Sequence, residues 1–322
     1  ANPEFTFTRV DNLERWHTSA EAARSSIAAT TLSAAPWSFA AGPAEALRTK
    51  LAQTGKHLGV VADIFVGLQT SADDVFVLPD AGKLEKSILK PFLTTGDLAA
   101  YSPARPSAWM IFPYEIAGDR AALLPGDALR KRTPNIWRHL ETHGERLRGR
   151  ERGKWDHERW YAFGRSQNLT QMAAPKLIVQ VTALRPTVIL DETGLHMTGG
   201  GSGPFYGIRP TVEALSLRYL LGLLNSRLFG WFIRGQSTVL RGGYIKFSKQ
   251  YIETAPIVLP ASKERHDRLV ELVDRMLTLH AKLGAAQSPD VEDNLRRQIA
   301  ATDHAIDALV YQLYGLTPEE IA

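Results

Sequence analysis

The sequence has no cysteine and little that could bind a metal. It contains 0 Cys and 9 His in 322 residues, and no HExxH motif occurs. Disulfide scaffolds, zinc ribbons, iron–sulfur clusters and thiol catalysis are therefore excluded. A chain without Cys is compatible with a reducing compartment, so we expect a cytoplasmic protein.

Long hydrophobic runs and a targeting signal are also absent. The longest apolar stretches, 58–68 and 220–233, are interrupted by Gly, Asp, Asn or Arg before they reach the about 18 residues that a membrane helix needs. We therefore expect no membrane contact. The first residues, ANPEFTFTRVD, lack a basic segment followed by an apolar one, so no signal peptide is expected. The sequence does not begin with Met, which suggests a cut or tagged chain.

Motifs that carry catalysis in many enzymes are missing. There is no GxxxxGK(S/T), GxGxxG or GxSxG, so neither a phosphate-binding loop nor a nucleophile elbow is expected. Asp80 and Glu85 are similar to the carboxylates of a metal-dependent nuclease, but the Asp/Glu-x-Lys triplet of such enzymes is missing. A nuclease with a divergent site stays open as an alternative. Otherwise we expect no metal site and no catalytic residue in this chain.

The composition is that of a globular protein, with 44% hydrophobic and 22% charged residues. Short runs rich in β-branched residues predict strands, and apolar residues three or four positions apart predict helices. The strands are expected over 58–66, 75–78, 109–112, 176–181, 187–190, 244–247 and 257–259, and the helices over 47–58, 215–225 and 227–234. The fold class is therefore α+β, a body of mixed strands with flanking helices.

The C-terminal part of the sequence has a helical period. Apolar residues recur at steps of three, four and seven over 269–283 and again over 291–313, on either side of a short Gly/Ser/Pro segment. Two such stripes predict an antiparallel helical hairpin over 261–322.

The rest of the chain divides into two parts. Residues 46–260 form the body, and residues 1–45 are rich in Ala, Ser and Thr. We expect this N-terminal part to be an extended strap or linker, in which Leu32 and the cluster at 36–39 supply the large apolar side chains.

The net charge is only +4, but its distribution is uneven. Residues 130–165 contain 11 Lys/Arg against 5 Asp/Glu, and residues 225–251 contain 5 Lys/Arg and no acid. Residues 262–322 contain 7 Lys/Arg against 11 Asp/Glu. The two basic segments suit a polyanion, although solvated faces of Arg and Glu would give the same counts.

The longer basic segment is interleaved with aromatic residues, among them Trp137, Trp155 and Trp160. Arg can clamp phosphates and read guanine edges through two hydrogen bonds, whereas we expect the Trp side chains to pack in the core. The residues expected to contact nucleic acid are Arg130, Lys131, Arg132, Arg148, Arg150, Arg152, Lys154 and Arg165 in this segment, and Arg241 and Lys246 in the shorter one.

Seven blocks of sequence, followed by a C-terminal signature, occur in an order typical of one family. They are LGVVADIFVGLQTSADDVFVL (58–78), ILKPFLTTGDLAAYSP (88–103), WMIFPYE (109–115), PKLIVQVTA (175–183), VILDETGLHMTGG (188–200), LRYLLGLLNSRLFGWFI (217–233), GGYIKFSKQYIETAPIVLP (242–260) and IDALVYQLYGLTPEEI (306–321). With these blocks the chain resembles, over roughly residues 30–322, the TaqI-like C-terminal specificity domain. That domain is the target-recognition part of adenine-N6 DNA methyltransferases and of related fused restriction–modification enzymes.

This resemblance implies that residues 46–260 bind double-stranded DNA sequence-specifically and deliver a target adenine to a methyltransferase domain. The catalytic half of the family carries a glycine-rich S-adenosylmethionine loop and an Asn/Asp-Pro-Pro-aromatic tetrad, and neither occurs here. The nearest string, NPEF at 2–5, lacks the second Pro. We therefore expect no cofactor in this chain, S-adenosylmethionine in a catalytic domain outside it, and no methyl transfer by the chain alone.

The resemblance also points to the turn GLQTS at 67–71. The family's usual Gly-x-x-Thr-Gly appears here with Ser71 in place of the second Gly, which is tolerable if that position needs no positive φ. Short polar turns can approach DNA without steric cost, so Gln69 or Thr70 is expected on the DNA-facing side. A module that only docks a protein partner through its helical hairpin stays open as another alternative.

Overall fold

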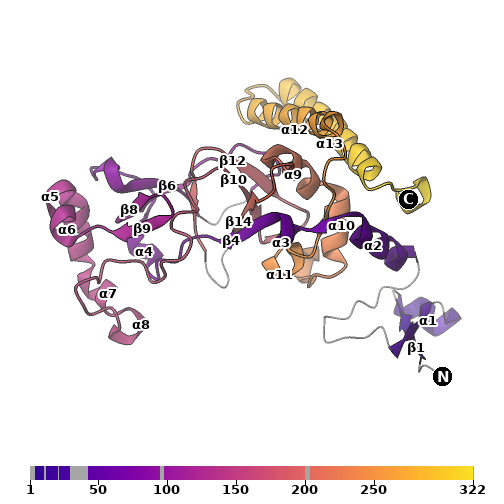
Figure 1. Ribbon diagram of the computed structural model, residues 1–322, viewed down its shortest axis with the longest axis horizontal. Coiled ribbons are helices and arrows are strands. Elements are labelled where there is room, and N and C mark those ends of the chain that lie inside the picture. Colours follow the sequence, from indigo (N-terminus) through magenta and orange to yellow (C-terminus); the bar gives the residue numbers. More distant parts are fainter. Residues whose placement is uncertain are drawn as a thin grey trace.

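The computed structural model describes residues 4–10, 12–20, 22–29, 43–94, 98–199 and 204–321. These residues form a mixture of helices and strands, which confirms the α+β class, and the molecule is elongated (Figure 1). Short helices lie at one end, a sheet lies in the middle, and two long C-terminal helices lie over the other half. None of the described helices is both long enough and apolar enough to span a bilayer.

The N-terminal residues form a small unit. β1 (Glu4–Arg9) and β2 (Ala23–Ala28) pair antiparallel, and α1 (Leu13–Ser19) connects them. In the described part, paired strands and a helix therefore replace the extended strap expected over 1–45. Leu32 and the cluster at 36–39 lie outside the described residues.

A four-stranded antiparallel sheet separates two hydrophobic cores. Its strand order is β12 (Val188–Asp191), β10 (Lys176–Gln180), β14 (Phe205–Pro210) and β4 (Ala62–Val66). Successive side chains of a strand point to opposite faces, so Leu177 and Val179 contribute to the first core and Ile178 to the second. A strand that is buried on both faces needs the continuous apolar run that β10 has.

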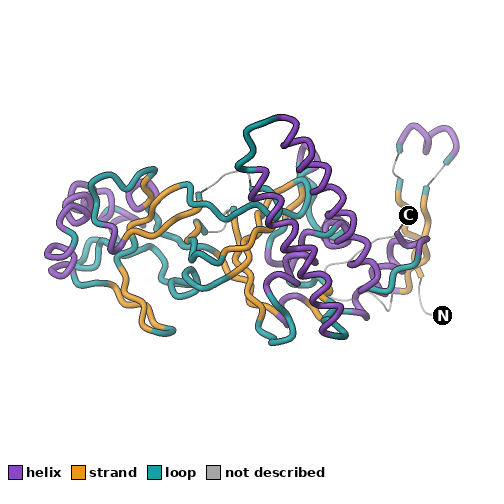
Figure 2. Tube along the Cα trace, turned by 90° about the horizontal axis from the view of Figure 1, so that it is seen from above, coloured by secondary structure: helices purple, strands orange, loops and turns teal. Residues whose placement is uncertain are grey.

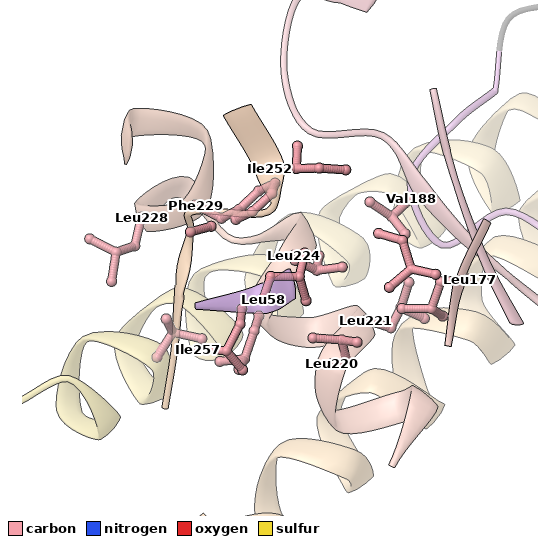
Figure 3. Close-up of a cluster of buried hydrophobic side chains, with 14 of the residues drawn as sticks. Leu58, Leu177, Val188, Leu220, Leu221, Leu224, Leu228, Phe229, Ile252 and Ile257 are labelled. Carbon is pink, nitrogen blue, oxygen red and sulfur yellow. The ribbon is translucent and has the colours of Figure 1, made fainter. Parts of the chain in front are cut away.

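The first core lies between the sheet and five helices. These are α2 (Pro43–Thr54), α9 (Leu217–Asn225), α10 (Arg227–Arg234), α12 (Lys263–Leu283) and α13 (Pro289–Leu313). Figure 3 shows Leu221 of α9 beside Leu177 and Val188 of the sheet. Ser216 and Ser226 start α9 and α10, because each side chain accepts a hydrogen bond from the N–H three residues later.

The structure confirms the C-terminal helical hairpin. α12 and α13 lie antiparallel side by side, and α12 packs on α9 (Figures 1 and 2). Gly222 permits this approach, because a Cβ there would lie 2.9 Å from Cγ2 of Val273. Tyr314 donates its hydroxyl proton to the Pro256 carbonyl at 2.6 Å. The first core thus continues across residue 260, so the expected boundary there does not separate two cores.

The second core is built from residues between 65 and 205. Its sheet has the order β13 (His196–Met197), β6 (Leu89–Leu93), β7 (Ala108–Ile111) and β5 (Val77–Leu78), and β8 (Tyr114–Ala117) and β9 (Arg120–Leu123) form a hairpin after it. The basic segment supplies α5 (Gly126–Arg132), α6 (Pro134–Thr142), α7 (Gly144–Arg148) and α8 (Arg150–Gly153). Trp137 and Trp160 are buried here, which confirms their expected place in the core.

Two expected strands begin as short helices. The segment 58–66 starts with α3 (Leu58–Val61) before β4, and the segment 75–78 follows α4 (Asp73–Phe76) into β5. A short apolar run fits a buried helical turn as well as a strand. The remaining elements are β3 (Lys56–His57), η2 (Lys86–Ile88), β11 (Thr182–Ala183), η3 (Arg241–Gly243), β15 (Ile245–Lys246), α11 (Lys249–Ile252), β16 (Pro256–Ile257) and α14 (Pro318–Ile321).

Candidate nucleic-acid interface

The turn at 67–71 follows β4 and is fixed by main-chain contacts. The Leu68 N–H donates to the Met197 carbonyl at 2.8 Å, and the Gly199 N–H donates to the Leu68 carbonyl at 2.8 Å. Gly67 has no room for a side chain, because a Cβ there would lie 2.4 Å from the Met197 carbonyl oxygen. The glycine of the motif is therefore required by close packing of two backbones.

The other side of the turn pairs with residues 164 and 165. The Gly164 N–H donates to the Thr70 carbonyl at 2.9 Å, and the Arg165 N–H donates to the Gln69 carbonyl at 3.1 Å. Ser71 has a φ of +59°. The condition for a tolerable Ser, that no positive φ is needed, is therefore not met, and this position adopts the conformation that favours Gly.

Thr70 and Gln69 have different surroundings. The Thr70 side chain is fully buried, donates to the Asp73 carboxylate and accepts a hydrogen bond from the Ala72 N–H at 2.9 Å. It therefore holds the turn just before α4. Gln69 is half-buried and lines an open depression together with Ser71 and Arg146. Of the two residues expected to face DNA, only Gln69 presents its side chain at the surface.

Arg150 is the main correction to the expected DNA contacts, because it is only 3% exposed. Its Nη1 donates to the Thr70 carbonyl at 2.7 Å, and its Nη2 donates to the carbonyls of Trp160 at 2.6 Å and Ala162 at 2.9 Å. Its Nε donates to the Leu147 carbonyl at 2.9 Å. The guanidinium of Arg150 thus binds four carbonyl groups and has no face left for a phosphate.

The buried guanidinium is also held by aromatic rings. Its Cζ lies 4.6 Å from the ring centre of Trp155 and 5.9 Å from that of Phe76. Burial lowers the pKa of Arg150 to about 10, so the group remains a cation at neutral pH. Arg150 therefore connects the basic helices to the turn at 67–71, and its role in any DNA contact is indirect.

The other expected cations of the basic segment lie at or near the surface. Lys131, Arg132 and Arg152 are exposed and make no ion pair within the described residues. The paired ones are Arg130 with Glu141 (3.6 Å), Arg148 with Asp156 (3.2 Å), Lys154 with Glu151 (3.8 Å) and Arg165 with Glu151 (2.6 Å). Such exposed pairs are weak, so they leave these cations available to a phosphate.

A strained segment presents Arg152. Glu151, Arg152 and Gly153 have φ values of 51°, 63° and 83°, directly after the buried Arg150. Left-handed backbone costs a non-glycine residue about 1–2 kcal/mol. The contacts of Arg150 on one side and the Glu151–Arg165 ion pair on the other hold this conformation, which places the Arg152 side chain in solvent.

Arg146 is a further candidate for DNA contact and is not among the contacts expected from the sequence. It lines the same depression as Gln69 and pairs with Asp74 at 3.2 Å. No pattern distinguishes it from the other Arg residues of the basic segment, since its position depends on contacts with residues about 70 positions away. It places a cation beside the polar side chain of the turn.

Arg241 and Lys246 belong to a different part of the molecule. Both are exposed, and they lie in η3 and β15, next to Ile245 and Phe247 of the first core. β15 pairs with β11, not with any strand of the second core. The structure therefore gathers Gln69 with the cations of 130–165 on elements of one core and leaves Arg241 and Lys246 on elements of the other.

The two carboxylates of the nuclease alternative have structural partners. Glu85 accepts hydrogen bonds from the N–H groups of Asn135 at 2.9 Å and Ile136 at 3.0 Å, at the start of α6. Burial raises the pKa of Glu85, but these main-chain hydrogen bonds outweigh it and leave the pKa below its usual value. Asp80 accepts from the Gly82 N–H at 3.2 Å. Within the described part of the chain, no group of three or more His, Asp or Glu could hold a metal.

Comparison with known proteins finds similarity to a family of specificity domains. Residues 128–257 match the family model of the TaqI-like C-terminal specificity domain. Over these residues the chain is similar to this specificity domain. The matched range begins in α5 of the basic segment and ends at β16, so it includes parts of both cores.

Two curated relatives are restriction–modification proteins. The chain is 23% identical to the type II restriction enzyme and methyltransferase RM.Eco57I of Escherichia coli, over 83% of this chain and 30% of that protein. It is 27% identical to the type II methyltransferase M.BanIII of Aneurinibacillus aneurinilyticus, over 66% of this chain and 38% of that protein. The chain thus spans about a third of the length of these relatives. A solved HsdS subunit from Thermoanaerobacter tengcongensis matches 84% of this chain and 50% of its own at 16% identity, with a TM-score of 0.30.

Proposed function

We propose that this chain is the DNA-specificity part of a restriction–modification enzyme and that it reads its site with the turn at 67–71. The specificity-domain match and the two restriction–modification relatives support the class of function. The observation that carries the role of the turn is the fixed position of Gln69, between main-chain contacts on both sides and above the buried Arg150. A side chain reads bases well when the backbone under it cannot move.

The exposed cations and the turn would have different roles in DNA binding. Lys131, Arg132 and Arg152 would bind phosphates and set the register, which carries no sequence information, whereas Gln69 would contact base edges. Gln can bind adenine through two hydrogen bonds in the major groove. The adenine to be methylated must leave the stack, and we assign that chemistry, together with S-adenosylmethionine, to a methyltransferase domain outside this chain.

Selection from a library of randomised duplexes tests this function. The 322-residue chain should enrich one short motif, and Gln69→Ala should relax or change that motif without lowering the melting temperature. Gln287→Ala, an exposed Gln in the loop between α12 and α13, is the matched control and should leave the motif unchanged. Unselective or absent duplex binding would contradict the proposal. Absent binding together with capture of a protein partner by the hairpin would favour the protein-docking alternative.

The same chain should not transfer methyl groups. Because the cofactor loop and the tetrad are missing, we expect titration calorimetry to show no binding of S-adenosylmethionine with a Kd below about 100 μM. That Kd corresponds to a standard binding free energy of about 5.5 kcal/mol. Tighter binding together with methylation of duplex DNA would show that a catalytic site lies within these residues. Nicking of DNA that depends on magnesium would instead favour the nuclease alternative.

A further inference from the structure

A cavity of about 460 Å³ lies between α10 and the helical hairpin, far along the chain from the turn at 67–71. Residues of α10, α12 and α13 line it, together with residues 100–101 and 184–186. Its volume falls within the about 300–1,000 Å³ that is typical of small-molecule sites. Most of its wall surface is apolar, with Met276 and Ile299 among the contributing residues.

Tyr101 is an unusual residue in the wall of this cavity. It is 1% exposed, and among the described residues no close hydrogen-bond partner of its hydroxyl group is present. The neighbouring Asn225 amide makes its two close hydrogen bonds with Val188, since its Oδ1 accepts from the Val188 N–H and its Nδ2 donates to the Val188 carbonyl, both at 2.9 Å. Burial raises the pKa of Tyr101 well above its ordinary value, and a weaker interaction with Asn225 opposes this rise. A buried hydroxyl without a close partner is costly, and a ligand that supplies an acceptor would remove that cost.

The backbone of Tyr101 is strained as well, with a φ of +61°. A bulky residue in this region is an outlier, and such outliers concentrate at functional sites, where the surrounding structure enforces them. The Tyr101 ring lies 6.2 Å from the imidazole of His280, which also lines the cavity. Burial, with a smaller contribution from Arg185, lowers the pKa of His280, so its ring is neutral and can donate or accept one hydrogen bond.

The charged groups of the wall favour an anion. Arg227 is paired with Asp307 at 3.2 Å, and Arg296 is paired with Glu292 at 2.8 Å. Arg185 and Arg234 make no ion pair within the described residues. Asp303 is the one carboxylate among the described residues of the wall. Burial, together with Asp303 and Asp307, raises the pKa of Tyr101 so that its phenol stays protonated. The two guanidinium groups without an ion pair offset the Asp303 carboxylate in the wall.

We propose that this cavity binds a small organic acid with an apolar body. The acid group would accept hydrogen bonds from the Tyr101 hydroxyl and the Arg185 guanidinium, and the apolar body would lie against Met276 and Ile299. The ligand would bridge α10 and the hairpin, so its binding would stabilise the first core without touching the turn at 67–71.

Titration calorimetry on the 322-residue chain tests this site with indole-3-acetate and decanoate, each against its uncharged amide. At least one acid should bind with a Kd below about 1 mM and at least about tenfold more tightly than its amide. Arg185→Gln should weaken binding about tenfold or more, and Tyr101→Phe about threefold or more. Arg241→Gln removes an exposed cation that does not line the cavity and should leave the affinity unchanged.

Thermal unfolding without ligand gives a second readout. Because the Tyr101 hydroxyl has no close partner among the described residues, Tyr101→Phe should fold and should melt at the same temperature as the parent or higher. A clear drop in melting temperature would show that the hydroxyl is already satisfied within the protein and would overturn the proposal. Failure of both acids to bind, or binding that is insensitive to Arg185→Gln and Tyr101→Phe, would overturn it as well.

Discussion

The two basic segments of this chain differ in how the fold uses their charge. Residues 130–165 form short helices on the second core, where one Arg is buried beneath a turn and most of the other cations are exposed. Residues 225–251 begin with the apolar helix α10, and their exposed cations lie at the edge of the first core. A similar excess of positive charge therefore gives an organised surface in only one half. What distinguishes the halves is the position of one buried guanidinium, not the number of cations.

Removing that guanidinium should have the largest effect. Arg150→Ala would remove one of the two donors of the Thr70 carbonyl and the donor of the Trp160 and Ala162 carbonyls, so we expect a loss of about 3 kcal/mol or more in the free energy of unfolding. Arg150→Lys keeps the charge but not the forked geometry and should still weaken site-specific binding. Urea unfolding measures the first effect and competition binding the second. The exposed Arg132→Ala should change stability by no more than about 0.5 kcal/mol; equal losses for both residues would contradict the distinction.

The stability of the second core should depend on pH through His196, and this can be measured by unfolding at a series of pH values. Burial, only partly offset by the hydrogen bond of Nδ1 with the Gly194 carbonyl oxygen, lowers the pKa of His196 to about 4 from an ordinary value of 6.5. As the pH falls, the His196 imidazole is therefore protonated in the unfolded chain before it is protonated in the folded chain. This stability is present above pH about 6.5 and is lost as the pH falls towards 4, by up to about 3 kcal/mol. His196→Gln should lack this component, whereas the exposed His304→Gln should retain it. Identical pH profiles for His196→Gln and the parent would show that His196 titrates normally.

Salt dependence compares the two basic segments directly. Changing Lys131, Arg132 and Arg152 together to Ala should reduce the slope of log affinity against log salt by about two to three, since each phosphate contact contributes about 0.9. In the matched triple variant, Arg241, Lys246 and Lys249 are changed to Ala. The slope should then change by less than the about 0.9 that one phosphate contact contributes. Equal changes would mean that DNA lies across both halves, and the reverse order would move the interface to the first core.

The smallest effect should come from the strained turn. Ser71→Gly relieves a positive φ of 59°, and we expect it to stabilise the chain by about 0.5–1 kcal/mol while site preference stays unchanged. Thermal unfolding measures this gain. The Ser71 side chain lies against Gly164, where an added Cβ would come within 1.9 Å of the Ser71 Oγ. A destabilised Ser71→Gly variant would mean that this packing outweighs the strain.

The parts of the fold that follow from local pattern could be predicted from the sequence. The helical hairpin repeats its apolar residues over many turns, and the uniformly apolar β10 has the pattern of a strand buried on both faces. The start of each strand predicted over 58–66 and 75–78 was wrong, because a few apolar or mixed residues do not distinguish a helical turn from a strand.

The candidate site shows the same limit. The basic segment and the turn at 67–71 are visible in the sequence, but Arg148, Arg150 and Arg152 look alike there. Only Arg150 meets the Thr70 carbonyl, 80 residues earlier in the chain, and only that contact decides which of the three is buried. The left-handed φ of Ser71 likewise depends on distant residues, because the preceding Gln69 and Thr70 carbonyls pair with residues 164 and 165.

Cross-linking from defined positions tests most directly whether the turn at 67–71, and not the shorter basic segment, reads DNA. A photoreactive amino acid at Gln69 and, in a second protein, at Arg241 would be irradiated with a duplex that carries the selected motif. The account predicts cross-links from position 69 to bases inside the motif and none to those bases from position 241. Cross-links to the motif from position 241 and not from position 69 would contradict it.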